Sequence, residues 1–225
     1  ISAQTTANMN PHLFLKGYAA YGVRDRKWKY ESEVEYSFLE KQYSPEEFPK
    51  NSIAISTRYD VMAPSDAMLP TDKDNVFASF KTRTIDQMSY FRQYNLRYMY
   101  EFDNHFGITA QLRHITQTPT GSLFYRSLGG DQVPELTQSE ASLILRYAPG
   151  EKVVVTKQKR HPVNHNFPVY VLMHTSGFKN VLGGDYTSNY TELSVTKRFW
   201  LNSYGRIDLY GRAGAQWNKV PFPLL

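Results

Sequence analysis

The segment Arg206–Trp217, with the sequence RIDLYGRAGAQW, alternates between apolar and polar side chains over its whole length. Successive side chains of a β-strand point to opposite faces, so the segment predicts a strand with one apolar face and one charged, polar face. The apolar face, which includes Ile207, Leu209 and Trp217, could pack on a soluble core or contact lipid. That choice decides the class of protein.

The same period of two recurs along the chain. It is clear in five further segments, Trp28–Leu39, Tyr94–Asp103, Phe106–Ile115, Glu140–Tyr147 and Asn189–Trp200, and weaker in His12–Gly22, Ser52–Asp60, Phe77–Arg83 and Pro168–Phe178. Asp103, Asn104 and His105 are residue types that tolerate positive φ, and they predict a tight hairpin. No window has a helical period over three turns. The sequence therefore predicts an all-β fold of about nine or ten antiparallel strands.

Three intervals rich in Pro, Gly, Asp, Asn and Lys predict long loops: Val61–Asp74, Thr116–Thr137 and Pro149–Phe167. Short turns that alternate with long loops are typical of outer-membrane β-barrels. Several segments also reach the ~9–11 residues that a tilted membrane strand needs, whereas soluble strands usually have about 5–6. The pattern favours an antiparallel transmembrane β-barrel with long loops. The alternative is a large soluble sandwich with one solvated face per sheet.

A barrel would give the two faces of each strand different surroundings. The charged side chains expected to face the lumen are Glu31, Glu33, Glu35, Arg97, Glu101, Arg206 and Arg212. The residues expected to face lipid or to form an interfacial girdle are Trp28, Tyr98, Leu193, Phe199, Leu209 and Trp217. The charged set could form a network of ion pairs that plugs or stiffens the barrel, or it could line a passage for a solute or polypeptide.

Composition agrees with this interpretation. Aromatic residues make up 15% of the 225 residues, and the net charge of +5 is spread along the chain rather than clustered as in a nucleic-acid-binding protein. The absence of cysteine excludes disulfides, thiol catalysis and cysteine-ligated zinc. No apolar run approaches the ~18 residues of a transmembrane helix. The chain starts without a methionine or signal peptide, so we expect residues 1–225 to be part of one barrel domain truncated at both ends.

Motifs in the loops and strand ends carry a more specific signal. They are YDVMAPSD (Tyr59–Asp66), LPTDKDNVF (Leu69–Phe77), LRYAPGE (Leu145–Glu151), NVLGGDY (Asn180–Tyr186), KRFWL (Lys197–Leu201) and AGAQWNKVPFPLL (Ala213–Leu225). With these motifs the chain resembles part of the C-terminal outer-membrane barrel of a Bacteroidota family of unknown function, in which a carboxypeptidase-regulatory-like domain usually precedes the barrel. That barrel is described as loosely similar to BamA-like surface-antigen barrels. The resemblance implies a place and an architecture, and it assigns no functional residues.

Candidate chemistry is sparse. His161 and His165, with His174 and Asp185, could form a loop metal site, but Pro162 and the lack of an adjacent Glu argue against a zinc-protease motif. A hydrolase could use His114 with Ser122 or Ser127. Oxygen donors for calcium occur in one acidic loop, at Asp66, Asp72, Asp74 and Asn75. The repeated Leu-Gly-Gly-Asp at Leu128–Asp131 and Leu182–Asp185 predicts tight turns.

None of these sets has the spacing of a known catalytic, cofactor or metal site, so we expect no enzyme, no cofactor and no bound metal. The sequence predicts a non-enzymatic integral barrel of the bacterial outer membrane that acts in envelope biogenesis or transport. Its expected partners are outer-membrane lipid and other envelope proteins, not nucleic acid. The alternatives are a soluble β-rich binding module and an outer-membrane hydrolase.

Overall fold

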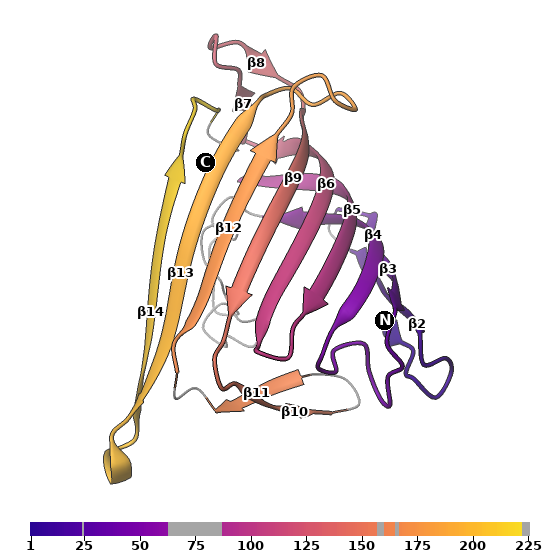
Figure 1. Ribbon diagram of the computed structural model, residues 1–225. Coiled ribbons are helices and arrows are strands. Elements are labelled where there is room, and N and C mark those ends of the chain that lie inside the picture. Colours follow the sequence, from indigo (N-terminus) through magenta and orange to yellow (C-terminus); the bar gives the residue numbers. More distant parts are fainter. Residues whose placement is uncertain (24, 63–86, 157–159, 165–166, 222–225) are drawn as a thin grey trace.

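One large antiparallel sheet dominates the structure. The computed structural model describes residues 1–23, 25–62, 87–156, 160–164 and 167–221. Among these residues, ten strands form this sheet in the order β1-β2-β3-β4-β5-β6-β9-β12-β13-β14 (Figure 1). Their bounds are β1 Ser2–Gln4, β2 Leu13–Gly22, β3 Lys27–Ser37, β4 Asn51–Met62, β5 Gln87–Glu101, β6 Phe106–Gly121, β9 Leu136–Tyr147, β12 Val169–Gly177, β13 Ser188–Trp200 and β14 Arg206–Gln216. The predicted all-β class is thereby confirmed.

Two small hairpins of the described residues lie outside the sheet. They are β7 (Tyr125–Arg126) with β8 (Gln132–Val133), and β10 (Lys152–Val155) with β11 (Arg160–Asn164). A single 3₁₀ turn, η3 (Asn202–Tyr204), lies between β13 and β14. In the described part of the chain, no helix is long and apolar enough to cross a membrane.

Period-two patterning located most strands to within a few residues. The segment Arg206–Trp217 forms β14, and the weaker predictions His12–Gly22, Ser52–Asp60 and Pro168–Phe178 correspond to β2, β4 and β12. The prediction Phe77–Arg83 falls outside the described residues. The tight hairpin is confirmed: β5 and β6 join through residues 102–105, and His105 adopts a φ of 62°.

The predicted loops need two corrections. In the interval 116–137, β6 continues to Gly121 and β9 begins at Leu136, because the threonines of this interval pair across the ladder, as Thr116 does with Thr137. The interval 149–167 contains the β10–β11 hairpin, and it leaves the sheet at the same end as the short turns 102–105 and 201–205 (Figure 1). Short turns and long loops are therefore not separated at opposite ends of the described sheet.

The register of the ladders gives the sheet two distinct faces. Cross-strand partners share a face, and successive pairs such as Glu31 with Arg58 carry most of the charged side chains of the long strands to one side. We call this side the charged face. The opposite side, which includes Tyr98 and Leu193, is the apolar face. Arg92 and Lys197 lie on this other side, opposite Tyr59 and Leu209.

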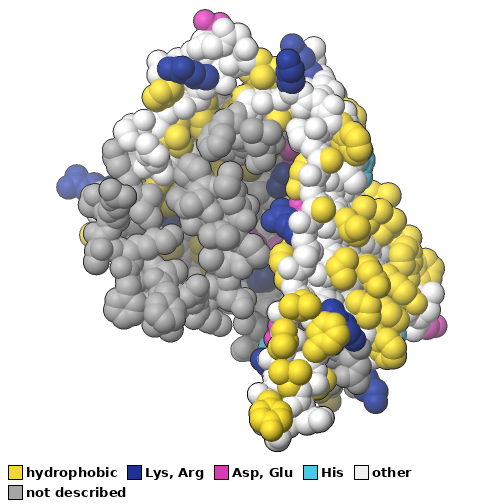
Figure 2. All heavy atoms as spheres, turned by 90° about the vertical axis from the view of Figure 1, so that its left-hand side faces the viewer, with side chains coloured by type: hydrophobic (Ala, Val, Ile, Leu, Met, Phe, Trp, Pro, Cys, Tyr) yellow, Lys and Arg dark blue, Asp and Glu magenta, His cyan; other side chains and the backbone are white. Residues whose placement is uncertain are grey.

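The apolar face is the exposed one. Trp28, Leu112 and Leu209 are 63%, 55% and 54% exposed, whereas Glu35 and Gln138 on the charged face are 3% and 0% exposed. The sheet curves so that β2–β4 turn behind β5 and β6 (Figure 1), and Figure 2 shows hydrophobic side chains gathered on the outside of this curve. This arrangement is the reverse of a soluble sheet, which buries its apolar side.

The small apolar core is also on the charged face. Phe14, Ala54, Phe91, Ile115 and Leu136 are each less than 10% exposed, and all five share a face with the charged residues by register. Among the described residues, β1 and β14 form the two edges of the sheet and do not pair with each other.

Candidate functional site: the charged face

Ion pairs link neighbouring strands across the charged face. Arg212 on β14 pairs with Glu192 on β13 at 2.6 Å, and Arg113 on β6 pairs with Glu140 on β9. Arg97 on β5 reaches Glu33 on β3, at 3.2 Å across the intervening β4. An ion pair that crosses an intervening strand in this way requires both of its side chains to lie on the inner side of the curved sheet.

The residues predicted to face a lumen all lie on this face, but they form two separate groups. Glu31, Glu33 and Glu35 come from β3, and Arg97 and Glu101 come from β5, so these five lie near one another. Arg206 and Arg212 lie at the far edge on β14, where Arg206 contacts Asp208 at 3.3 Å. The lumen itself stays a prediction.

A connected chain of ion pairs, with one backbone hydrogen bond among them, crosses one end of the charged face. Lys50 contacts the Glu35 carboxylate at 3.1 Å through Nζ, and its backbone N–H donates to Glu101 Oε2 at 3.0 Å. Glu101 accepts from Arg160 at 2.8 Å, and Arg160 contacts Glu151 at 3.3 Å. Glu151 also contacts Arg146 at 2.6 Å. We call these six residues the end network: Glu35, Lys50, Glu101, Arg146, Glu151 and Arg160.

The end network joins the sheet to two connecting segments. Lys50 belongs to the β3–β4 connection, and Arg160 is the first residue of β11. The side chains of Glu35, Lys50 and Glu151 are each less than 5% exposed. Breaking one partner of such a buried pair leaves an uncompensated charge, so the network fixes both segments across this end of the sheet.

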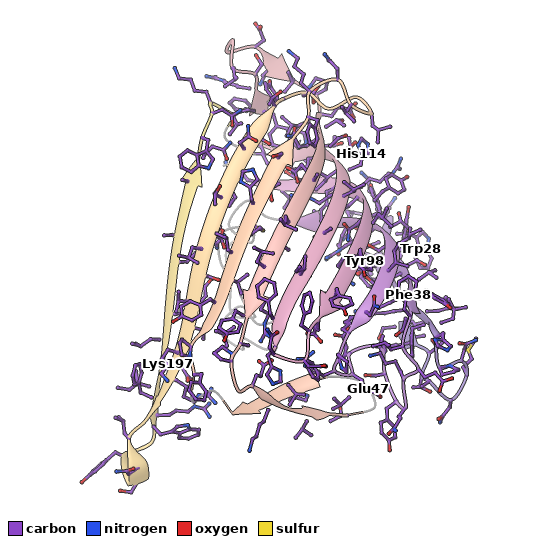
Figure 3. The ribbon with its side chains drawn as sticks, viewed as in Figure 1. Trp28, Phe38, Glu47, Tyr98, His114 and Lys197 are labelled. Atoms are coloured by element: carbon purple, nitrogen blue, oxygen red, sulfur yellow. The ribbon has the colours of Figure 1, made fainter. Side chains whose placement is uncertain are left out.

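The β3–β4 connection is held by its own polar contacts. The Glu47 carboxylate, which lies at this end in Figure 3, accepts from the backbone N–H groups of Gln42, Tyr43 and Ser44. The Lys41 ammonium donates to the carbonyls of Glu47 and Pro49, at 2.7 Å each. Burial lowers the pKa of Lys41, and the nearby Glu47 carboxylate opposes this shift.

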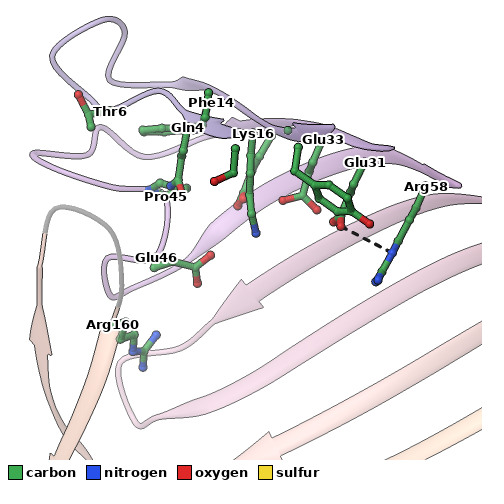
Figure 4. Close-up of a pocket in the computed structure, with 15 residues that line it drawn as sticks. Gln4, Thr6, Phe14, Lys16, Glu31, Glu33, Pro45, Glu46, Arg58 and Arg160 are labelled. Atoms are coloured by element: carbon green, nitrogen blue, oxygen red, sulfur yellow. Dashed lines mark ion pairs between the residues drawn. The ribbon is translucent and has the colours of Figure 1, made fainter. Parts of the chain in front are cut away.

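A cavity of about 890 Å³ opens on the charged face beside β1–β4. Figure 4 shows Lys16, Glu31, Glu33 and Arg58 around it, with Arg160 on the opposite side. Its acidic side chains have basic partners: Glu31 lies 3.8 Å from Arg58, and Glu33 pairs with Arg97. Mixed charges that already neutralise one another define a polar, water-accessible space rather than a site for one ion.

The residues predicted to face lipid or to form a girdle all lie on the apolar face, and each is exposed. Their exposed fractions are 63% for Trp28, 39% for Tyr98, 46% for Leu193, 45% for Phe199, 54% for Leu209 and 68% for Trp217. Aromatic rings contact one another across strands: Trp28 packs on Tyr21, and Phe38 packs edge-on against Tyr98 (Figure 3). Contact of this face with lipid stays a prediction.

The structure does not assemble the predicted metal ligands. Asp185 accepts from the backbone N–H of Thr137 at 2.7 Å, His161 lies in β11, and His174 lies in β12. His165 and the possible calcium ligands Asp66, Asp72, Asp74 and Asn75 lie outside the described residues. Across the described part of the chain, no group of three or more acidic or histidine side chains is placed to hold a metal ion.

The predicted histidine–serine pair is different in the structure. His114 Nδ1 contacts Ser139 Oγ at 2.9 Å, rather than Ser122 or Ser127, because Ser139 is its direct partner on β9. Both Leu-Gly-Gly-Asp segments form turns as predicted: Gly130 and Gly183 have φ values of 93° and 83°.

Comparison with known proteins adds one match. No curated protein and no solved structure was found to match the chain. Residues 125–222, from β7 to beyond the end of β14, match the model of the C-terminal domain of DUF5686, a family of unknown function.

Proposed function

We propose that the chain is part of an integral β-barrel of a bacterial outer membrane, of the Bacteroidota type that the sequence resembles, and that it acts in envelope biogenesis or transport. The observation that carries the proposal is the inverted exposure of the sheet. Within β3, Val34 and Tyr36 are 44% and 45% exposed, whereas Glu35 between them is 3% exposed. Alternating side chains of this kind suit lipid outside and a polar interior.

Strand length supports the same proposal. The strands β5, β6, β9 and β13 have 15, 16, 12 and 13 residues, more than the ~9–11 that a tilted strand needs to cross a bilayer. In water, an apolar surface of this extent would favour aggregation or a partner. In lipid the same surface is stabilised, provided that further strands pair with both edges of the sheet and close it.

The charged face itself supports a structural role. Its acidic and basic side chains pair with each other, and the end network holds two connecting segments across one end. A lumen lined in this way would be narrow at that end. This favours a barrel that interacts with envelope components over a wide, open pore.

Membrane fractionation of the natural protein tests the proposal. We expect the protein to remain in the outer-membrane fraction after washes with carbonate and urea, to float with proteoliposomes, and to require detergent for extraction. A known periplasmic protein from the same cells serves as the control for soluble carry-over. Recovery of the protein in the soluble fraction without detergent would contradict the barrel and favour a soluble β-rich binding module.

A further inference from the structure

A polar group interrupts the apolar face near one end of the sheet. On β12, His174 and Ser176 project from this face, and their direct partners on β13 are Thr191 and Asn189. Three neighbours of these four on the same face, Leu172, Leu193 and Ala141, are apolar. A compact polar island within an apolar surface has a desolvation cost in either lipid or a protein interface, so its presence calls for a role.

The four side chains form one chain of contacts. Ser176 Oγ lies 3.2 Å from His174 Nε2, and His174 Nδ1 lies 2.8 Å from Thr191 Oγ1. Asn189 Oδ1 accepts from Ser176 at 3.0 Å. In an activated nucleophile, a hydroxyl lies within hydrogen-bond distance of one nitrogen of an imidazole. A third group binds the other imidazole nitrogen and orients the ring, and these contacts have that arrangement.

Trp217 contacts the Thr191 end of this series of contacts. Its indole Nε1–H donates to Thr191 Oγ1 at 2.8 Å. Because indole N–H only donates, Thr191 Oγ1 accepts this bond, and its second lone pair can accept from His174 Nδ1–H. His174 Nε2 then carries no proton. The Ser176 hydroxyl donates its single proton to Asn189 Oδ1, and it has to turn that proton to His174 Nε2, 3.2 Å away, to become the nucleophile.

We propose that Ser176 and His174 hydrolyse acyl esters of membrane lipids at the outer surface of the barrel. This adds an activity to the proposed function and replaces the expectation that the chain is not an enzyme. The chemistry depends on the four side chains alone, whereas the choice of lipid esters rests on the proposed membrane location.

The position of the island supports a lipid ester as substrate. In membrane proteins, tryptophan is enriched at the level where acyl chains meet headgroups, and ester groups of lipids lie at that level. Trp217 contacts Thr191 directly, so Ser176 and His174 lie at the same depth. Leu172 and Leu193 on the same face would contact the acyl chain of the substrate.

The reaction balances in two steps. Ser176 Oγ adds to the ester carbonyl carbon as its proton passes to His174 Nε2, the bond from carbon to the alcohol oxygen breaks, and the alcohol leaves with that proton. Water then adds to the acyl-Ser176 carbon and gives a proton to His174. The bond to Oγ breaks, the fatty acid leaves, and the proton returns to Ser176.

A second histidine–serine pair on the same face provides a matched control. His114 contacts Ser139 at 2.9 Å, but Ser139 is only 4% exposed. The backbone N–H of Phe178 donates to the Ser139 carbonyl, so the β12–β13 connection lies against this residue. Substrate can reach Ser176, which is half-buried, whereas it cannot reach Ser139.

The first experiment uses the natural protein purified in detergent and a fluorophosphonate probe. We expect covalent labelling that mass spectrometry locates on Ser176, with loss of labelling in Ser176→Ala and in His174→Ala. Ser139→Ala and His114→Ala should be labelled like the natural protein. Absence of an adduct on Ser176 in a protein that keeps its heat-modifiable mobility on gels would overturn the catalytic proposal.

The second experiment compares esters. Hydrolysis of short soluble nitrophenyl esters and of phospholipid in mixed micelles should both fall about 100-fold or more in Ser176→Ala, since a general base and its nucleophile contribute at least that much. Activity on soluble esters without activity on micellar lipid would overturn the substrate class alone. Flotation with liposomes tests the membrane location separately. Failure to float would contradict the barrel proposal, whatever the result of the esterase assays.

Discussion

Arg160 on β11 donates to both carboxylate oxygens of Glu101 on β5, each at 2.8 Å. The two side chains are 15% and 14% exposed, and they are 59 residues apart in the sequence. Arg160 also packs over the Phe48 ring at 5.5 Å, so one guanidinium links β5, the β3–β4 connection and the β10–β11 hairpin. The contact makes a hairpin outside the main sheet part of one rigid end.

Arg160→Ala should therefore release the β10–β11 hairpin. Glu101 and Glu151 would lose a partner in a partly buried position, which costs about 1–3 kcal/mol. Hydrogen exchange of Lys152–Val155 should become faster, while exchange in β6 and β9 should not change. Arg206→Ala is the control, because Arg206 is 53% exposed and its pair with Asp208 should contribute less than ~1 kcal/mol. Equal effects of the two substitutions would contradict the structural role of Arg160.

Charge on the apolar face should prevent insertion into lipid. Leu193→Arg places a guanidinium in the middle of β13 on the apolar face, at a cost of roughly 2–4 kcal/mol near the bilayer midplane. Thr196→Arg, on the charged face of the same strand, should be tolerated. The measurement is folding yield into liposomes, read from heat-modifiable mobility on gels. Similar yields for both variants would argue against contact between this face and lipid.

Acid should loosen the β10–β11 hairpin through Glu151. Burial alone would raise the pKa of Glu151, but its hydrogen bond to Arg146 and the charges of Arg146 and Arg160 lower it below its ordinary value of 4.5. A carboxyl with a lowered folded-state pKa stabilises the fold above its unfolded-state pKa, and this contribution is lost as pH falls through the folded-state pKa. The protection factor of the hairpin amides, which is the exchange rate corrected for its intrinsic pH dependence, should thus be constant from pH 7 to about 5 and fall in more acidic solution. Glu151→Gln should remove most of this dependence. An unchanged pH profile in that variant would assign the effect to another group.

Gly177 should not tolerate a side chain. A Cβ at this position would collide with Gln138 Nε2 and Ser188 Oγ, and Gln138 is fully buried and donates to the Tyr186 carbonyl at 3.1 Å. Gly177→Ala should lower the free energy of unfolding by about 1–3 kcal/mol, measured by urea unfolding in detergent. Gly211→Ala is the matched control, because the nearest atom to its Cβ is the Val195 carbonyl oxygen at 4.0 Å. If both variants unfold at the same urea concentration, the packing around Gly177 is looser than described.

The strand positions and their faces could be predicted because alternation is a local property. The residues Arg206 to Trp217 specify which side chains share a face without reference to any other strand. The end network could not be predicted in the same way. Lys50 and Arg160 belong to connecting segments without periodicity, and their partners Glu35 and Glu101 become close only after the strands pair.

The contact partners of the two histidines also could not be predicted from local alternation. Register decides that His114 meets Ser139 and that His174 meets Thr191, and register is a relation between strands that sequence patterning does not give. The spacing of His174 and Ser176, two residues apart on one strand, was a usable signal. It places both on the same face at neighbouring positions, whereas the predicted metal site includes His174 without Ser176.

The order of strands in the sheet has a consequence for how the chain is made. Among the described residues, every strand of the large sheet pairs only with the sheet strands that precede and follow it along the chain. No segment has to be inserted between two strands that have already paired, so the sheet can grow in the order of the strands along the chain, one hairpin at a time. Each added hairpin covers the previous edge and exposes a new one. In this order β14 is the last of the described strands to be added, and its residues are almost all exposed.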